Sequence, residues 1–167
     1  ALAALLALTA ARLSTRVGPD GVAQLLEDQP RERWDGRLIA AGLAHLARSA
    51  EGEELTVWHL RAEIAALHTT APSSQTTDWP RIAETYDRLS EIDPSPMVVL
   101  ARAVAIGRAE GAAAGLQAMP TLEENPYAHA AAAVFLSGLG RSRDARVEFE
   151  KAVALARTEP ERRLMER

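Results

Sequence analysis

The sequence predicts an all-α protein built from stacked helical hairpins, with about seven to nine helices in all. Two observations predict this fold. Apolar residues make up 47% of the 167 residues but aromatic residues only 4%, so Ala, Leu, Val and Ile must form most of the core. Such a composition favours helices that pack closely through small residues over a sheet. In addition, short breaks that contain Gly or Pro separate apolar stretches of helical length.

Charge and cysteine content exclude some classes of protein. The net charge of −4 and the pI near 5.6 argue against nonspecific binding of nucleic acid, which usually needs a basic domain. We therefore expect no direct DNA binding by this chain. The sequence has no cysteine, so it forms no disulfide, and it fits a reducing cytoplasm.

The first part of the chain, residues 1–50, is expected to form an N-terminal cap and junction. Residues 1–11 (ALAALLALTAA) predict a helix that is too short to span a bilayer and lacks the positive segment of a signal peptide. We interpret it as an amphipathic helix cut from a longer protein. Residues 15–27 contain Pro19-Asp20-Gly21, a turn signal between two short apolar runs, which predicts a small β-hairpin.

The stretch LLEDQPRERWDGRLI, residues 25–39, combines a helix start with an unusual concentration of charge. Asp28 and Gln29 are expected to cap a helix that begins at Pro30, and Trp34 is expected to begin its buried face. These roles leave the charge of Glu27, Asp28, Arg31 and Arg33 unexplained. A solvated cluster of ion pairs and a docking surface remain the two interpretations.

The middle section, residues 51–124, predicts degenerate helical repeats. A helix is expected at 54–70, and Asp78 is a good cap for a helix that continues to Ile92. Ser95 and Pro96 then start another helix, which the sequence breaks at Gly111.

The last section, residues 125–167, predicts the best-formed repeat. With Gly140 at the turn, Ala145, Phe149 and Ala152 share one face of the second helix, as the small and aromatic positions of a tetratricopeptide (TPR) repeat do. Ser142 is expected to cap that helix, and Thr158 to cap a short last one. An earlier copy of the repeat is only half matched, by the second helix at residues 82–94. The helix pair at residues 97–119 lacks an aromatic residue at the wedge position. We therefore expect a TPR-like superhelix in a single domain, 1–167.

No motif of catalysis, cofactor binding or metal binding is found in the sequence, so we expect a protein that is not an enzyme. His59 and Glu63 lie four residues apart on one predicted helix face, which a surface pair explains better than a cation site. Two acidic pairs, Glu53-Glu54 and Glu123-Glu124, are interpreted as solvated surface.

Two groups of arginines stand near the C-terminal end of the chain. Their members are Arg141, Arg143 and Arg146, and then Arg162, Arg163 and Arg167. Aromatic residues are too few here for base stacking, so RNA binding is disfavoured. Ionic helix surface is the simplest interpretation, and a docking patch for an acidic partner is the next.

Four segments carry a resemblance to a known family. They are LLEDQPRERWDGRLIAAGLAHL, WHLRAEIAALH, TTDWPRIAETYDRLSEIDPSPMVVLARAVAI and LGRSRDARVEFEKAVALA. In this order the chain, over about residues 5–165, resembles the C-terminal TPR-like extension of a group of extracytoplasmic-function RNA polymerase sigma factors that is common in actinobacteria. After the Pro-Ser-Pro motif, the family pattern has an Asn where this chain has Ala101. The arginine that follows in the pattern is present here as Arg102.

The resemblance implies a non-catalytic regulatory extension that contacts sigma regions 2 and 4 of the same protein, and RNA polymerase as a further partner. We expect Asp28, Gln29, Arg31, Trp34 and Arg102 to be the partner-binding residues. A free-standing TPR-like adaptor that binds a peptide is the alternative.

A third interpretation, a small-molecule sensor, needs a polar pocket, for which His59, Glu63, His68 and Arg102 are the candidate lining residues. An incomplete stack of helices is expected to leave an apolar end that forms homodimers of the isolated fragment.

Overall fold

The computed structural model describes residues 1–52, 54–121 and 123–166, and in this part of the chain the protein is all-α, as predicted. Glu53, Leu122 and Arg167 lie outside the described residues. Nine α-helices are found in the described part: α1 (Leu2–Ala10), α2 (Gly36–Ser49), α3 (Val57–Thr70), α4 (Trp79–Ile92), α5 (Pro96–Glu110), α6 (Ala112–Gln117), α7 (Pro126–Gly138), α8 (Ser142–Leu155) and α9 (Glu159–Met165). Three short 3₁₀ helices lie between α1 and α2: η1 (Leu13–Thr15), η2 (Leu26–Asp28) and η3 (Arg31–Arg33).

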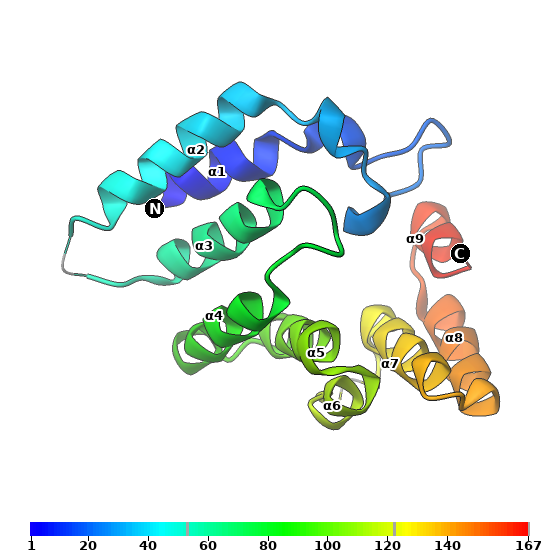
Figure 1. Ribbon diagram of the computed structural model, residues 1–167. Helices are drawn as coiled ribbons and strands as arrows, with labels where there is room; N and C mark the ends of the chain where they lie inside the picture. The colour runs from blue at the N-terminus through cyan, green and yellow to red at the C-terminus, as the bar shows by residue number, and fades with distance from the viewer. Residues whose placement is uncertain (53, 122, 167) are drawn as a thin grey trace. The chain divides into compact units, whose positions relative to one another are not determined.

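The chain forms two compact units, Ala1–Asp78 and Trp79–Arg167. In the first unit α1 packs against both α2 and α3 (Figure 1). Small residues allow the close approach of α1 and α2, because a Cβ atom added at Gly42 would lie 2.6 Å from Leu8 Cγ. Leu8 and Ala4 are fully buried at this contact, so the apolar face of residues 1–11 is part of the core.

Residues 15–27 form the predicted turn but not the predicted β-hairpin. Gly21 has φ = 75°, which permits the turn after Pro19-Asp20. The Gly18 N–H donates to the Val22 carbonyl at 2.8 Å, and Val17 and Ala23 form an isolated antiparallel bridge. No strand is found among the described residues. The pairing does not extend into strands because η1 ends just before it, at Thr15, and η2 begins just after it, at Leu26.

The start of α2 corrects the prediction of a helix from Pro30. Pro30 and Trp34 have extended backbones, with ψ of 103° and 145°, so the helix cannot run through this segment. Instead η3 makes one 3₁₀ turn, and Asp35 caps α2 by accepting hydrogen bonds from the N–H groups of Arg37 and Leu38 at 2.9 and 3.1 Å. Asp28 and Gln29 therefore do not cap α2. The predicted burial of Trp34 is confirmed, since its side chain is 7% exposed.

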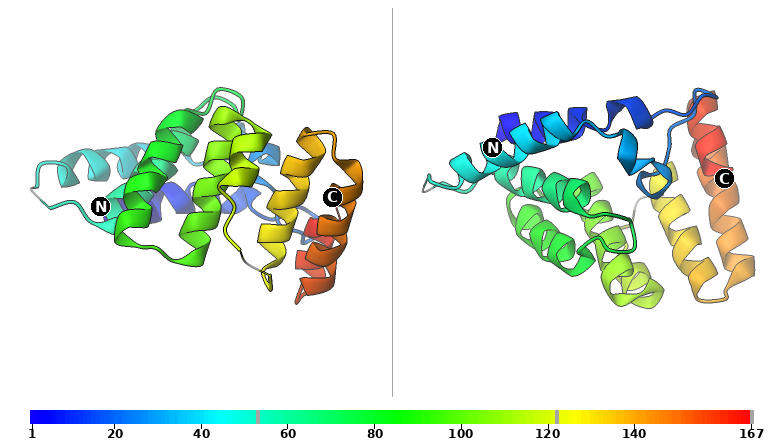
Figure 2. Two further views of the ribbon diagram at one scale, coloured as in Figure 1. Left: turned by 90° about the horizontal axis from the view of Figure 1, so that it is seen from below. Right: turned by 45° about the horizontal axis from the view of Figure 1, so that its top comes forward.

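The second unit consists of helical hairpins. The helices α4 and α5 pack against each other, as do α7 and α8, which lie side by side in Figure 2. The aliphatic positions of the repeat pattern are buried: Ile82 and Leu89 on α4, and Ala145 and Ala152 on α8. Phe149, its aromatic position on α8, is only half-buried. Gly140, with φ = 73°, lies at the turn of the second hairpin, where the sequence predicted it.

The connection between α7 and α8 is one residue tighter than predicted. The Arg141 N–H donates to the Leu136 carbonyl at 2.9 Å, which closes the C-terminus of α7 around Gly140. Because this motif extends to Arg141, that residue takes the N-cap position and Ser142 is the first residue of α8. Thr158 caps α9 as predicted, by accepting from the Glu161 N–H at 3.3 Å.

Phe135 supplies the aromatic wedge that the sequence of residues 97–119 lacks. It projects from α7 against α5 and α6, where two glycines make room for it. A Cβ atom at Gly115 would lie 2.6 Å from Phe135 Cζ and 2.7 Å from Gly107 Cα. The degenerate hairpin is thus completed by a side chain of the next one. Among the residues that the structure describes, every helix is too short or too polar to traverse a bilayer.

Candidate functional site

The charged stretch around Trp34 folds into a compact cluster within the first unit. The Trp34 Nε1–H donates to Thr15 Oγ1 at 3.0 Å, and the Thr15 hydroxyl lies 3.0 Å from the Arg12 carbonyl oxygen. The Gln29 side chain, 7% exposed, donates to the Gln24 carbonyl at 3.1 Å. We call Arg12, Thr15, Gln29, Arg31 and Trp34 the Trp34 cluster. Its hydrogen bonds hold the irregular segment between α1 and α2 in one conformation.

Arg31 joins this segment to the C-terminus of α3. Its Nη1 donates to the carbonyl oxygens of His68 and Ala71, at 2.5 and 2.7 Å. The last carbonyls of a helix have no partner within the helix and carry the negative end of its dipole, so a guanidinium is well placed there. The Arg31 Cζ also lies 4.7 Å from the centre of the Trp34 ring, within reach of a cation–π contact.

Positive charge accumulates at the Trp34 cluster. The Arg12 Cζ lies 5.8 Å from the centre of the same indole ring. Burial lowers the pKa of Arg12, and the neighbouring charges of Arg16 and Arg31 lower that pKa further. The pKa of His68 falls to about 4, first because of burial and then because of the positive charges of Arg12 and Arg31. His68 is therefore neutral at neutral pH.

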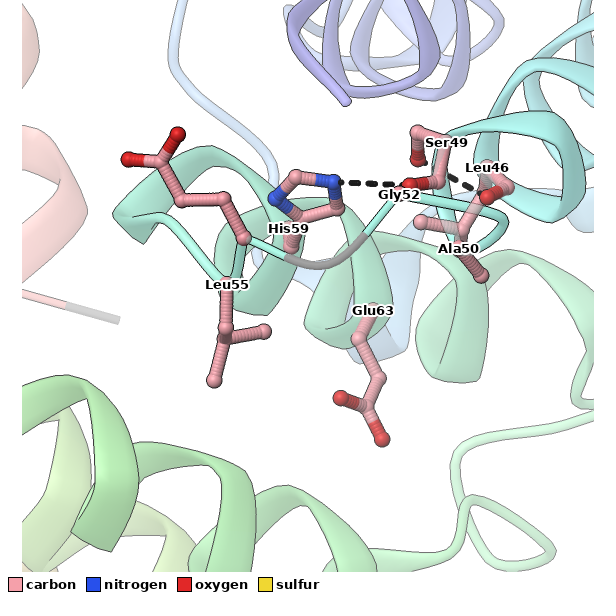
Figure 3. Close-up of a pocket in the computed structure, with 8 residues that line it drawn as sticks. Leu46, Ser49, Ala50, Gly52, Leu55, His59 and Glu63 are labelled. Carbon is pink, nitrogen blue, oxygen red and sulfur yellow. Dashed lines mark hydrogen bonds between the residues drawn. The ribbon is translucent and has the colours of Figure 1, made fainter.

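A separate open pocket of about 340 Å³ lies between the end of α2 and the start of α3 (Figure 3). Leu46, Ala50 and Leu55 give it an apolar wall, and His59, Glu54 and Glu63 contribute polar groups. Both nitrogens of the His59 ring are already used. Nδ1 accepts from the Thr56 N–H at 3.2 Å as part of a capping box. Nε2 contacts the Ser49 carbonyl at 3.3 Å, drawn as the dashed line that starts at the His59 ring in Figure 3.

Only two of the four residues expected to line a sensor pocket are found at this pocket. His59 and Glu63 both line the pocket, whereas His68 and Arg102 do not. His68 stands beside the Trp34 cluster, and Arg102 lies in the second unit. A metal at His59 would have to displace its capping bonds, and no group of three His, Cys, Asp or Glu side chains suited to a metal ion occurs among the described residues.

The five residues expected to bind a partner lie in different surroundings. Asp28 is exposed, Gln29 and Trp34 are buried, and Arg31 is half-buried against α3. Arg102 donates from Nε to Asp87 Oδ1 at 2.5 Å, which links α5 to α4. The structure thus brings Gln29, Arg31 and Trp34 together within the first unit, whereas Arg102 belongs to the second unit.

Four of the C-terminal arginines form ion pairs with carboxylates three or four residues away in the chain. Arg141 pairs with Asp144 at 2.7 Å, Arg146 pairs with Glu150 at 2.9 Å, and Arg162 and Arg163 share Glu159. Arg167 and Glu53, which the sequence placed in an arginine group and an acidic pair, lie outside the described residues. The paired arginines agree with the interpretation of ionic helix surface.

Comparisons with known proteins give relatives but no activity. Residues 1–50 match a family of unknown function (DUF6596). Over 159 residues the chain is 37% identical to an uncharacterized protein of Rhizobium meliloti (strain 1021), and this alignment covers 93% of the chain and 38% of that protein. The chain therefore spans well under half the length of that relative. No solved structure matches it.

Arg12 and Arg16 are the members of the basic region that sequence reasoning missed. They stand four residues apart after α1, a spacing that occurs often by chance in a chain rich in arginine. Their relation to Trp34 and Arg31 depends on the turn at residues 18–21 and on the extended backbone at Pro30. The i, i+4 spacing of the two arginines was the one signal that the sequence offered.

Proposed function

We propose that this chain is a non-catalytic interaction segment of an RNA polymerase sigma factor of the extracytoplasmic-function group, acting in the cytoplasm. It modulates transcription initiation by contacting sigma regions 2 and 4 or polymerase. The observation that carries this proposal is how much of each protein is covered by the alignment with the Rhizobium meliloti protein. The identity of 37% runs through 93% of this chain but occupies only 38% of the other protein, so a similar helical segment there belongs to a longer polypeptide. That is the arrangement expected of an extension.

The Trp34 cluster supports a role in fixing orientation. Hydrogen bonds of Trp34 and Arg31 tie residues 24–34 to η1 and α3, and the Gln29 amide ties this segment internally to the Gln24 carbonyl. These bonds hold the segment in a fixed orientation within the first unit. Under this proposal Gln29 and Trp34 act as positioning residues. Asp28, whose side chain is exposed, is the member of the set that contacts the partner directly.

A free-standing adaptor that binds a peptide is the second candidate function. The helical hairpins of the second unit favour it, because stacked hairpins present extended surfaces for peptides. The exposed leucines Leu2, Leu6 and Leu13 favour self-association of the isolated chain. The apolar pocket beside His59 favours a small-molecule sensor, although capping bonds already occupy the His59 ring.

Isothermal titration calorimetry of this chain against a separately produced polypeptide of sigma regions 2 and 4 tests the proposal. We expect binding in the micromolar range or tighter at physiological salt, and weaker binding by Asp28→Ala. Glu32→Ala, which removes the same charge from an exposed position four residues away, is the matched control. The absence of binding to the sigma polypeptide would favour the adaptor.

A further inference from the structure

Three neighbouring arginines of the first unit have no acidic partner among the residues that the structure describes. Arg12, Arg16 and Arg31 lie close enough for the charges of Arg16 and Arg31 to act on Arg12. The ion pairs found among the described residues include none to any of the three, and Arg31 Nη2 is buried with no hydrogen-bond partner. Like charges that are partly withdrawn from water repel one another, so this arrangement costs stability in the isolated chain.

Other arginines of the chain are arranged differently. Arg81, Arg102, Arg141, Arg146, Arg162 and Arg163 each pair with a carboxylate at 3.2 Å or less. The charges of those six are compensated by carboxylates of the protein itself, whereas no carboxylate of the described residues pairs with Arg12, Arg16 or Arg31. Uncompensated charge of this kind is typical of functional sites, where the missing counter-charge is supplied by a ligand.

The three arginines differ in how a ligand can reach them. Arg31 is held against the α3 carbonyls through Nη1, so it contributes a fixed positive charge. Arg12 is half-buried over the Trp34 ring, and Arg16 is exposed at the end of η1. Arg12 and Arg16 are thus the two guanidinium groups that an approaching anion meets.

We infer that Arg12 and Arg16, with Arg31 behind them, bind the carboxylates of an acidic, Asp- or Glu-rich segment of a partner protein. Guanidinium groups match carboxylates in geometry, and such charge-assisted hydrogen bonds are strong. The inference adds a binding site to the proposed function. It rests on that proposed function for the identity of the partner.

Nucleic acid fits this surface less well than an acidic segment does. The chain has a net charge of −4, and the indole of Trp34 is 7% exposed, so the site offers no aromatic face on which a base can stack. A protein segment with several carboxylates supplies negative charge without requiring a stacking surface.

Calorimetric titration of the 167-residue chain with an acetylated and amidated hexaglutamate peptide tests the inference, first at low and then at physiological ionic strength. We expect binding that weakens with salt, and affinities about tenfold lower for Arg12→Gln and for Arg16→Gln. Arg37→Gln removes the same charge from an exposed position on α2 and is expected to bind as the unsubstituted chain does. Arg12→Lys keeps the charge and is expected to recover most of the affinity.

Controls for folding and for the chemistry of the ligand decide how the result is interpreted. Circular dichroism and thermal unfolding verify that each variant folds, and Arg16→Gln, at an exposed site, keeps the test valid if Arg12→Gln does not. A hexaglutamine peptide is expected not to bind. Inorganic phosphate that bound at the same arginines as tightly as hexaglutamate would overturn the assignment to carboxylates.

The inference and the proposed function fail in distinguishable ways. Hexaglutamate binding that Arg12→Gln and Arg16→Gln leave unchanged, or no binding at all, overturns the inference whatever the sigma polypeptide does. If hexaglutamate binds through these arginines but the sigma polypeptide does not bind, the site for an acidic segment is supported. Its assignment to sigma regions 2 and 4 is then overturned.

Discussion

The guanidinium of Arg31 donates to the carbonyl oxygen of His68 at 2.5 Å, across 37 residues of sequence. A second bond to the Ala71 carbonyl, at 2.7 Å, fixes the same guanidinium at the end of α3. The pair explains why a positive residue follows Pro30. A charged donor satisfies carbonyls that the helix itself leaves without partners.

Removing this guanidinium is expected to destabilise the first unit. Arg31→Ala loses two charge-assisted hydrogen bonds and a cation–π contact, which we expect to lower the free energy of unfolding by about 2–4 kcal/mol. Urea unfolding followed by circular dichroism measures the loss. Arg33→Ala, which removes an exposed arginine two residues away, is expected to change stability by less than about 0.5 kcal/mol. Equal stability of the two variants would contradict the anchoring role.

The indole N–H of Trp34 has a role that a phenyl ring cannot fill. Trp34→Phe leaves the Thr15 hydroxyl without its donor and reduces the volume of a buried side chain, so we expect a loss of about 1–3 kcal/mol. Trp58→Phe, at a residue that is 44% exposed, is the control and is expected to be nearly neutral. Differential scanning calorimetry of both variants measures the difference, and a neutral Trp34→Phe would show that the hydrogen bond contributes little.

His68 is expected to make stability depend on pH. The unfolded chain protonates this imidazole below about pH 6.5, whereas the folded chain does so only near pH 4, because burial and the charges of Arg12 and Arg31 lower its pKa. Between these values the unfolded chain binds more protons, so stability falls as the pH drops from about 6.5 to 4, by up to about 3 kcal/mol.

Urea unfolding at a series of pH values measures this dependence. His68→Gln is expected to remove most of the slope between pH 6.5 and 4, whereas His45→Gln, on α2, is expected to keep it. An unchanged slope in His68→Gln would mean that other groups cause the acid sensitivity.

The close packing of α5, α6 and α7 is expected to reject any side chain at Gly115. Alanine favours a helix over glycine, yet its Cβ would meet Phe135 and the Gly107 backbone, so Gly115→Ala is expected to cost about 1–3 kcal/mol. Gly36→Ala, where an added Cβ meets nothing within 4 Å, is the matched control and is expected to be neutral or stabilising. Thermal unfolding of both variants compares them, and a stabilised Gly115→Ala would contradict the tight contact.

Local signals predicted most helix positions, because those signals act over a few residues. Ser95-Pro96, Gly111 and Gly140 mark the ends of helices from their own backbone preferences, and the structure follows them. The predicted start of α2 was wrong for the same reason, since local signals do not report contacts with distant residues. Pro30 is as compatible with a 3₁₀ turn as with a helix, and the extended backbone of Trp34 is stabilised by Thr15, 19 residues away.

The candidate site was less predictable than the helices. The sequence identified Trp34 as buried and Arg31 as unusual, but the partners of Arg31 lie 37 and 40 residues away. The same holds for the Phe135 wedge, which belongs to the next hairpin and fills space that two glycines leave. Contacts of this kind depend on how helices pack, which the pattern of a single helix does not specify.

Transcription in vitro tests the proposed function most directly. Core polymerase with a polypeptide of sigma regions 2 and 4 is assayed at a promoter of that sigma factor, with and without this chain added. The account predicts that the chain changes the rate of initiation in a saturable manner, and that Asp28→Ala reduces the change whereas Glu32→Ala does not. A rate that stays the same at every concentration of the chain would contradict a role in initiation.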